Sequence, residues 1–222
     1  MKTFFAACAA AFIGTQASAT TYDFNDQTLP SIFDSASGFG FRTESGNPSN
    51  AALSFTGGGS TVGTTPAGVN TLHTGGQLRH ATTGALNLSS TASISFDFLF
   101  GTSGSTPYGS FENADGSEDF IVAYSVDGGS TFAEFFRIDT EDNTYHGDLA
   151  TAVVALPGAA QTGSTLLSFL QVRNSGSAYD HWALDNVTLS VAAVPLPAGL
   201  PLLLTALGGA ALLRNRRKQK AA

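Results

Sequence analysis

Side chains that carry oxygen are the groups in this sequence best suited to chemistry. They are densest in the segment ENADGSED, residues 112–119, where six of the eight residues bear a carboxylate, amide or hydroxyl. Oxygen ligands of this kind, placed on a turn, suit Ca²⁺. The spacing is not that of an EF-hand, because a loop aligned on Gly116 has Phe111 at its first ligand position and Val122 at its last. The segment predicts an irregular calcium site with the ligands Asn113, Asp115 and Asp119.

The same carboxylates allow a second chemistry, since glycoside hydrolases use two carboxyl groups that face each other. The candidates are Glu112, Glu118, Asp119, Glu134 and Glu141. Solvated loop acids are far commoner than catalytic ones in an acidic chain. The sequence also contains no Gly-x-Ser-x-Gly elbow, no His-Glu-x-x-His and no phosphate-binding Gly-x-x-x-x-Gly-Lys. It therefore favours a non-enzyme, with a secreted carbohydrate-active hydrolase as the alternative.

The charge is unevenly distributed along the chain. All 17 acidic residues lie between Asp23 and Asp185, a segment that holds four arginines and no lysine, so its net charge is about −13. Such a surface repels phosphate backbones, which excludes nucleic acid as a partner. Cations, neutral sugars and basic proteins remain possible ligands. Solubility in a salty extracellular medium explains the charge equally well.

The N-terminus has the pattern of a secretory signal peptide. Lys2 precedes an apolar run over residues 4–14, and the small residues Ala17-Ser18-Ala19 predict cleavage after Ala19. Cys8, the single cysteine, lies inside the apolar run, so the mature protein has no thiol. Catalytic cysteine and cysteine-ligated zinc are thereby excluded.

The C-terminus contains a candidate membrane span. Residues 191–213 are predominantly apolar, and roughly 20 such residues suffice to cross a bilayer as a helix. A basic membrane-stop cluster follows, made of Arg214, Arg216, Arg217, Lys218 and Lys220. Because positive charges stay on the cytoplasmic side, the acidic body is expected outside.

A short proline motif precedes the apolar helix: Val194, Pro195, Leu196, Pro197 and Ala198. Motif, helix and terminal arginine cluster together resemble the PEP-CTERM sorting signals of Gram-negative bacteria, in their Val-Pro-Leu-Pro-Ala variant. The resemblance implies that an exosortase, a membrane protease, removes the helix. The ectodomain would then pass from an inner-membrane-anchored intermediate in the periplasm to the cell surface or the medium. An ordinary single-span anchor is the alternative.

The expected organisation is a signal peptide over 1–19, one ectodomain over 20–193, the sorting motif and transmembrane helix over 194–213, and a basic cytoplasmic tail over 214–222. The ectodomain has short apolar runs separated by turn residues, which is typical of an all-β, two-sheet, jelly-roll-like sandwich. Its predicted strands are 21–24, 51–55, 77–81, 92–100, 119–125, 131–139, 166–174 and 182–191. Asp127-Gly128 predicts a hairpin, Asp185-Asn186 a bulge, and residues 56–76 a long loop.

The segments YDFNDQTLP, SFDFLF, EDFIVAYSVDGGSTF and WALDNVTL resemble the jelly-roll sandwiches of extracellular adhesion and carbohydrate-binding modules, including MAM-like and cleaved-adhesin domains. The resemblance implies adhesion or association with exopolysaccharide. It also implies a structural calcium where the terminal strands meet, with the ligands Asp23, Asn25, Asp26, Asp185 and Asn186. A bulge that only binds its own backbone is the alternative for the last two. The aromatic residues placed in polar loops, which could stack on sugars, are Tyr108, Phe111, Tyr145 and Tyr179.

Overall fold

The computed structural model describes residues 19–56, 58–102, 105–112, 116, 118–173 and 181–191, with Ala92 and Val191 described by their backbone only. They belong to one compact unit, Ala19–Ala192. The predicted signal peptide lies outside the described residues except for Ala19, and the predicted sorting motif, membrane helix and basic tail lie outside them entirely. Within the described part of the chain, no helix is long and apolar enough to span a bilayer.

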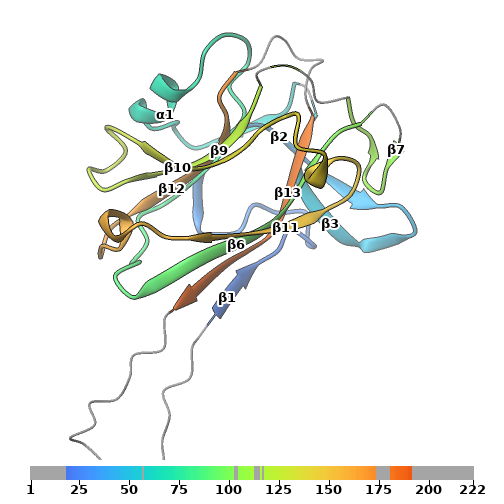
Figure 1. Ribbon diagram of the computed structural model, residues 1–222. Coiled ribbons are helices and arrows are strands. Elements are labelled where there is room, and N and C mark those ends of the chain that lie inside the picture. Colours follow the sequence, from blue (N-terminus) through green and yellow to red (C-terminus); the bar gives the residue numbers. More distant parts are fainter. Residues whose placement is uncertain are drawn as a thin grey trace, which may run out of the picture. The chain divides into compact units, whose positions relative to one another are not determined.

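The described domain is an all-β sandwich with one short α-helix, which confirms the all-β sandwich part of the prediction (Figure 1). The strands are β1 (Ala19–Tyr22), β2 (Phe33–Glu44), β3 (Asn47–Phe55), β4 (Ser60–Val62), β5 (His80–Thr83), β6 (Thr91–Phe100), β7 (Ser105–Thr106), β8 (Gly109–Ser110), β9 (Phe120–Ser125), β10 (Ala133–Ile138), β11 (Ala150–Ala155), β12 (Leu166–Gln171) and β13 (Trp182–Val191). The helical elements are α1 (Ala67–Leu72), η1 (Asn143–Tyr145) and η2 (Gly158–Ala160).

The two layers of the sandwich share strand β2. The hydrogen-bonded order is β10-β9-β12-β5-β2-β3-β13-β6-β11, with β1 on β13 and β4 on β2. The first half of β2, from Phe33 to Ser37, pairs with β5, whereas its second half, from Gly40 to Glu44, pairs with β3. The predicted pair of sheets is therefore one continuous sheet that bends at β2, where Gly38 has a φ of +73°. A positive φ suits glycine because it has no Cβ.

The core lies between the layers and is aromatic. The predicted alternation in β6 is confirmed, since Ile94, Phe96, Phe98 and Phe100 are all fully buried. Trp182 of β13 is also fully buried, as β13 pairs with β6 in antiparallel register. Burial of large aromatic side chains supplies most of the driving force for a domain of this kind.

Both outer faces of the sandwich are partly covered. The hairpin β7–β8 places Tyr108 and Phe111 against Leu99 and Ala183 on one layer, and both aromatic residues are almost completely buried. Their predicted role as exposed sugar platforms is therefore wrong. On the other layer, residues 56–76 contain β4 and α1 rather than a simple loop, and Val69 of α1 packs with Ile121, Leu170 and Phe132.

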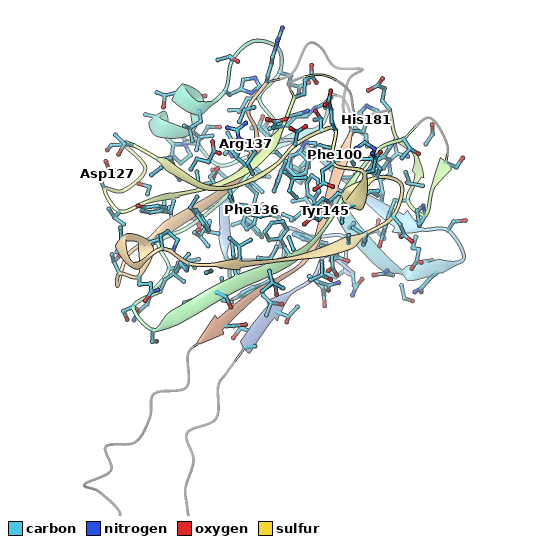
Figure 2. All side chains as sticks on the ribbon, viewed as in Figure 1. Phe100, Asp127, Phe136, Arg137, Tyr145 and His181 are labelled. Atoms are coloured by element: carbon cyan, nitrogen blue, oxygen red, sulfur yellow. The ribbon has the colours of Figure 1, made fainter. Side chains whose placement is uncertain are left out.

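The β9–β10 connection turns at Asp127, as the sequence predicts (Figure 2). The Asp127 carboxylate accepts hydrogen bonds from the backbone N–H and the hydroxyl of Thr131 at 3.0 and 2.7 Å, and from the Ser125 hydroxyl at 2.8 Å. These bonds to Thr131 and Ser125 lower the pKa of Asp127 to about 2. Gly128 and Gly129 follow with positive φ. The turn is thus fixed by local hydrogen bonds.

Candidate functional site

The predicted bulge in the last strand of the domain brings two acidic strand residues together. Asp185 of β13 lies opposite Asp97 of β6, and the register shifts immediately after Asp185. Asn186 has a φ of 49°, which lets its Nδ2 donate to Asp97 Oδ2 at 2.8 Å while its backbone N–H donates to Asp185 Oδ1 at 2.7 Å. The backbone N–H of Phe24 also donates to Asp185. Asp185 thereby ties the beginning of the domain to its last strand.

Burial raises the pKa of Asp185 to about 6, and the charges of Asp97 and Asp23 add to the effect. Asp185 is 1% exposed, so its charged form loses nearly all contact with water. We call Asp23, Asp97, Asp185 and Asn186 the terminal carboxylate cluster. Asp97 was not predicted from the sequence, although a lone acid alternating with phenylalanines in SFDFLF marks the outer face of a strand.

Two of the five predicted ligands turn away from this cluster. Asn25 Oδ1 accepts a hydrogen bond from the backbone N–H of Ala51 at 3.0 Å. Asp26 is exposed and accepts two hydrogen bonds from Thr28, which lower its pKa. No three His, Cys, Asp or Glu side chains of the described residues are arranged to hold a metal ion. Calcium at the terminal carboxylate cluster stays a prediction.

Asp185→Asn is expected to make the calcium-free protein more stable at pH 7.5. The folded-state pKa of Asp185 lies above its ordinary value of 3.8, so only the folded state holds the proton between about pH 4 and 6. Stability contributed by this group therefore falls by about 2–3 kcal/mol as pH rises through that window. Denaturant unfolding in EDTA at pH 4.5 and 7.5 measures the effect. Equal pH dependence in the wild type and the variant would contradict it.

The acidic residues at the start of β9 and in β10 are joined by an arginine. Arg137 Nη1 donates to Asp119 Oδ2 at 2.7 Å, and its Nε and Nη2 donate to Glu134 at 2.9 and 2.5 Å. The hydrogen bonds to Glu134, followed by the one to Asp119, raise the pKa of Arg137. Asp119 also accepts from the backbone N–H of Thr140. Asp119 thus connects two strands, while its predicted calcium partners Asn113 and Asp115 lie outside the described residues.

An open pocket of about 370 Å³ lies where β2 bends. It is lined by residues 38–40 of β2, by Thr56, and by residues 58–60, which lead into β4. Glycines form most of this wall, so the pocket presents backbone N–H and C=O groups together with the hydroxyls of Thr56 and Ser60. Its size is at the lower end of small-ligand sites. A wall of hydrogen-bonding groups suits a ligand rich in hydroxyls.

Two glycines in this wall are constrained differently. A Cβ built on Gly59 would lie 2.4 Å from the backbone oxygen of Phe39, whereas a Cβ built on Gly40 would meet nothing within 4 Å. Gly59 is therefore required for the close approach of the β3–β4 connection to β2. Gly40 leaves the pocket open, and a side chain there would enter it.

Gly59→Ala is expected to destabilise the fold by about 1–3 kcal/mol, because the added methyl must push the two backbone segments apart. Gly40→Ala is expected to leave stability unchanged or raise it by up to about 1 kcal/mol, since its methyl meets free space and restricts the unfolded chain. Thermal unfolding of the two variants provides the comparison. The same melting temperature for both would contradict the assigned packing.

Of the aromatic residues proposed to contact sugar, Tyr145 of η1 is half-buried and lies edge-on to Phe98, with ring centroids 6.0 Å apart. Tyr145 and Phe136, both labelled in Figure 2, pack against the core. Tyr179 lies outside the described residues. The described aromatic side chains thus belong mainly to the core. The pocket, lined by backbone, was not predicted from the sequence.

The fold and the backbone-lined pocket define this chain as an all-β sandwich module. The sequence matches the Reelin subrepeat B family over residues 57–190, and the chain belongs to that family. The match extends from the β3–β4 connection, which lines the pocket, to β13. No curated protein matches the sequence.

Several solved structures are similar to the domain. A cleaved adhesin domain of Lys-gingipain from Porphyromonas gingivalis has 13% identity and a TM-score of 0.45, covering 79% of this chain and 99% of that one. A family 29 carbohydrate-binding module has 12% identity and a TM-score of 0.42, with coverages of 79% and 86%. A family 11 carbohydrate-binding module of a Clostridium thermocellum cellulase has 12% identity and a TM-score of 0.39, with coverages of 79% and 95%. Likeness at this level does not bear on what this chain binds.

Proposed function

We propose that this chain is an exported, non-catalytic surface or matrix protein whose sandwich domain binds extracellular polysaccharide. The observation that carries the proposal is the pocket of about 370 Å³ at the β2 bend, whose wall offers backbone amides and hydroxyls. Sugars present many hydroxyl groups, which need donors and acceptors at fixed positions. Because the pocket is built on hydrogen-bonded strands, those positions are rigid before a ligand arrives.

The absence of catalysis is part of the proposal. Two of the candidate acids, Asp119 and Glu134, are bound by the same arginine, Arg137, at 2.7 and 2.5 Å. Carboxylates held in this way are not free to act as an acid and a nucleophile on either side of a sugar bond. A third candidate, Glu141, is exposed. These contacts favour a binding module over the alternative of a carbohydrate-active hydrolase.

Binding and turnover separate the two functions. Gly40→Leu fills the pocket from a position where a Cβ has free space, and Gly163→Leu is the matched control, since Gly163 is exposed with equally free space around its Cβ. The full chain in mild detergent is titrated with a panel of neutral and acidic oligosaccharides. We expect binding that Gly40→Leu abolishes and Gly163→Leu retains. Hydrolysis of any of these sugars that stops on substitution of one carboxylate would overturn the proposal.

Delivery to the surface is proposed to depend on the C-terminal signal. Residues 194–198 would be recognised by an exosortase, the basic cluster from Arg214 would hold the tail in the cytoplasm, and the helix would be removed from an inner-membrane intermediate. Mass spectrometry of the C-terminus of surface material tests this step. A surface protein that still ends at Ala222 would favour a plain membrane anchor.

A structural calcium ion is proposed at the terminal carboxylate cluster. Asp97 and Asp185 lie opposite each other there, and carboxylate oxygens are ligands of the kind that Ca²⁺ prefers. A bound ion would offset the cost of burying the charge of Asp185. Isothermal titration with CaCl₂ is expected to show one site that Asp185→Asn removes. Unchanged binding in Asp185→Asn would place any calcium elsewhere.

A further inference from the structure

Arg42 of β2 is exposed in a strongly acidic domain and forms no ion pair with any described residue. Its Nη2 donates one long hydrogen bond, 3.4 Å, to the uncharged Thr56 Oγ1. The nearest acid along the same strand, Glu44, accepts hydrogen bonds from Asn50 and Asn47 instead. A guanidinium group has five N–H donors in a planar fork. Most of the hydrogen-bonding capacity of Arg42 is therefore available to a ligand.

Two other arginines of the domain already have hydrogen-bond partners within the protein. Arg137 is bound by Asp119 and Glu134, and Arg79 is fully buried, with Gln171 at 3.5 Å from its Nη1. Few positive charges can thus contact a ligand at the surface. This arrangement does not suit a ligand that needs many contacts with basic side chains, such as a nucleic acid.

Arg42 lies at the rim of the pocket. Its bonding partner Thr56 lines the pocket, and a Cβ built on Gly109 of the β7–β8 hairpin would lie 3.5 Å from its Nη1. The guanidinium group of Arg42 therefore lies between the β3–β4 connection and the β7–β8 hairpin. The same end of the domain includes His181, labelled in Figure 2, whose pKa is lowered to about 4 by burial and by the charges of Arg79 and Arg42.

We propose that Arg42 binds the carboxylate of a uronic acid residue whose ring occupies the pocket, so that the protein prefers acidic polysaccharide over neutral polysaccharide. This inference rests on the proposed function and specifies the ligand class of the same site. A carboxylate matches the guanidinium fork with two parallel hydrogen bonds. Arg42 is a single arginine at the rim, so it can bind one carboxylate of each bound sugar in this way.

The acidity of the domain does not prevent this contact. At physiological ionic strength, charges separated by more than about 8 Å are largely screened, whereas a direct guanidinium–carboxylate pair is affected much less. Distant carboxylates of the domain thus slow the approach of an acidic sugar. The preference for acidic over neutral sugar is determined by the direct pair between Arg42 and the ligand carboxylate. Neutral sugar residues of the same polysaccharide can occupy the rest of the pocket.

The test compares an acidic sugar with its neutral methyl ester, which has the same chain of sugar rings. The full chain in mild detergent is titrated in EDTA with tetragalacturonate and with its fully methyl-esterified form. The wild type is expected to bind tetragalacturonate at least tenfold more tightly than the ester. Arg42→Gln is expected to lose this difference, and Arg42→Lys to retain part of it, because lysine keeps the charge without the fork. Arg173→Gln, which removes an exposed arginine that does not line the pocket, is the control.

The outcomes distinguish a failure of the Arg42 inference from a failure of the proposed polysaccharide binding. Equal binding of both sugars, blocked by Gly40→Leu and unchanged in Arg42→Gln, would overturn the inference and leave polysaccharide binding intact. The inference also fails if tetragalacturonate binds only after calcium is restored and without need of Arg42. If no sugar of either kind binds the wild type, the proposed function fails together with the inference. Melting temperatures of all variants show that a loss of binding is not a loss of folding.

Discussion

Trp182→Ala is expected to destabilise the protein by about 3–5 kcal/mol, the largest effect of any single substitution considered for this chain. The indole is fully buried and stacks on Phe55 with ring centroids 3.7 Å apart and an interplanar angle of 12°. It also contacts Phe98 at 5.8 Å and Phe120 at 5.1 Å, which belong to different layers of the sandwich. Its removal leaves a cavity that rigid strands on both sides cannot close.

The measurement is denaturant unfolding followed by circular dichroism, because Trp182 is the single tryptophan and its loss removes the fluorescence signal. Tyr124→Ala is the matched control. Tyr124 is only half-buried at the edge of the core, and its loss is expected to cost less than half as much. A change below about 1 kcal/mol in Trp182→Ala would contradict the description of the core.

The second large effect is a loss of stability on acidification through His80. Burial, together with the charge of His73, lowers the pKa of His80 to about 4, from an ordinary value of 6.5. The ring is fully buried between the hydroxyls of Thr65 and Thr82, at 2.9 and 3.0 Å, and is neutral in the folded state. Since the unfolded chain takes up a proton below pH 6.5 and the folded one does not, stability falls by about 3 kcal/mol between pH 6.5 and 4.

His80→Gln tests this effect, because glutamine hydrogen-bonds but does not titrate. The quantity of interest is the difference in unfolding free energy between the wild type and His80→Gln, followed from pH 7.5 to pH 4. The opposite contribution of Asp185 is present in both proteins and cancels in this difference. We expect the advantage of the wild type to shrink steadily below pH 6.5. A difference that is constant over the whole range would contradict the assignment.

The strands with strong alternation could be predicted from the sequence because their signal is local. In β6 the phenylalanines at 96, 98 and 100 face the core, and the register shift at Asp185-Asn186 in β13 lies where the alternation breaks. The hairpin at Asp127 also follows from its own residues, since its hydrogen bonds span only a few positions.

Strands β2 and β11 were not predicted, and the reasons are physical. The sequence of β2, FDSASGFGFRTE, is rich in glycine and serine, which favour strands poorly outside a formed sheet. Its strand conformation comes from neighbours on both sides, β3 and β5, and β5 is distant in sequence. The sequence of β11, ATAVVA, alternates only between small residues, so its buried face is visible only once it pairs with β6.

The candidate site was predictable only in part. Asp23, Asp185 and Asn186 come together because the terminal strands β1 and β13 pair, which the sandwich fold suggests. Asp97 joins them through the register of β6, which no local pattern specifies. The pocket depends on the contact between Gly59 and the backbone of Phe39, and a glycine-rich stretch such as residues 57–59 indicates only a turn.

Hydrogen exchange measured by mass spectrometry, with and without bound oligosaccharide, tests most directly whether this protein binds sugar at the β2 bend. The full chain is compared alone and with saturating tetragalacturonate or its methyl ester. We expect slower exchange in peptides covering residues 33–62, and no such change in Gly40→Leu. Protection confined to the terminal carboxylate cluster or to β10 and η1, with residues 33–62 unaffected, would contradict it.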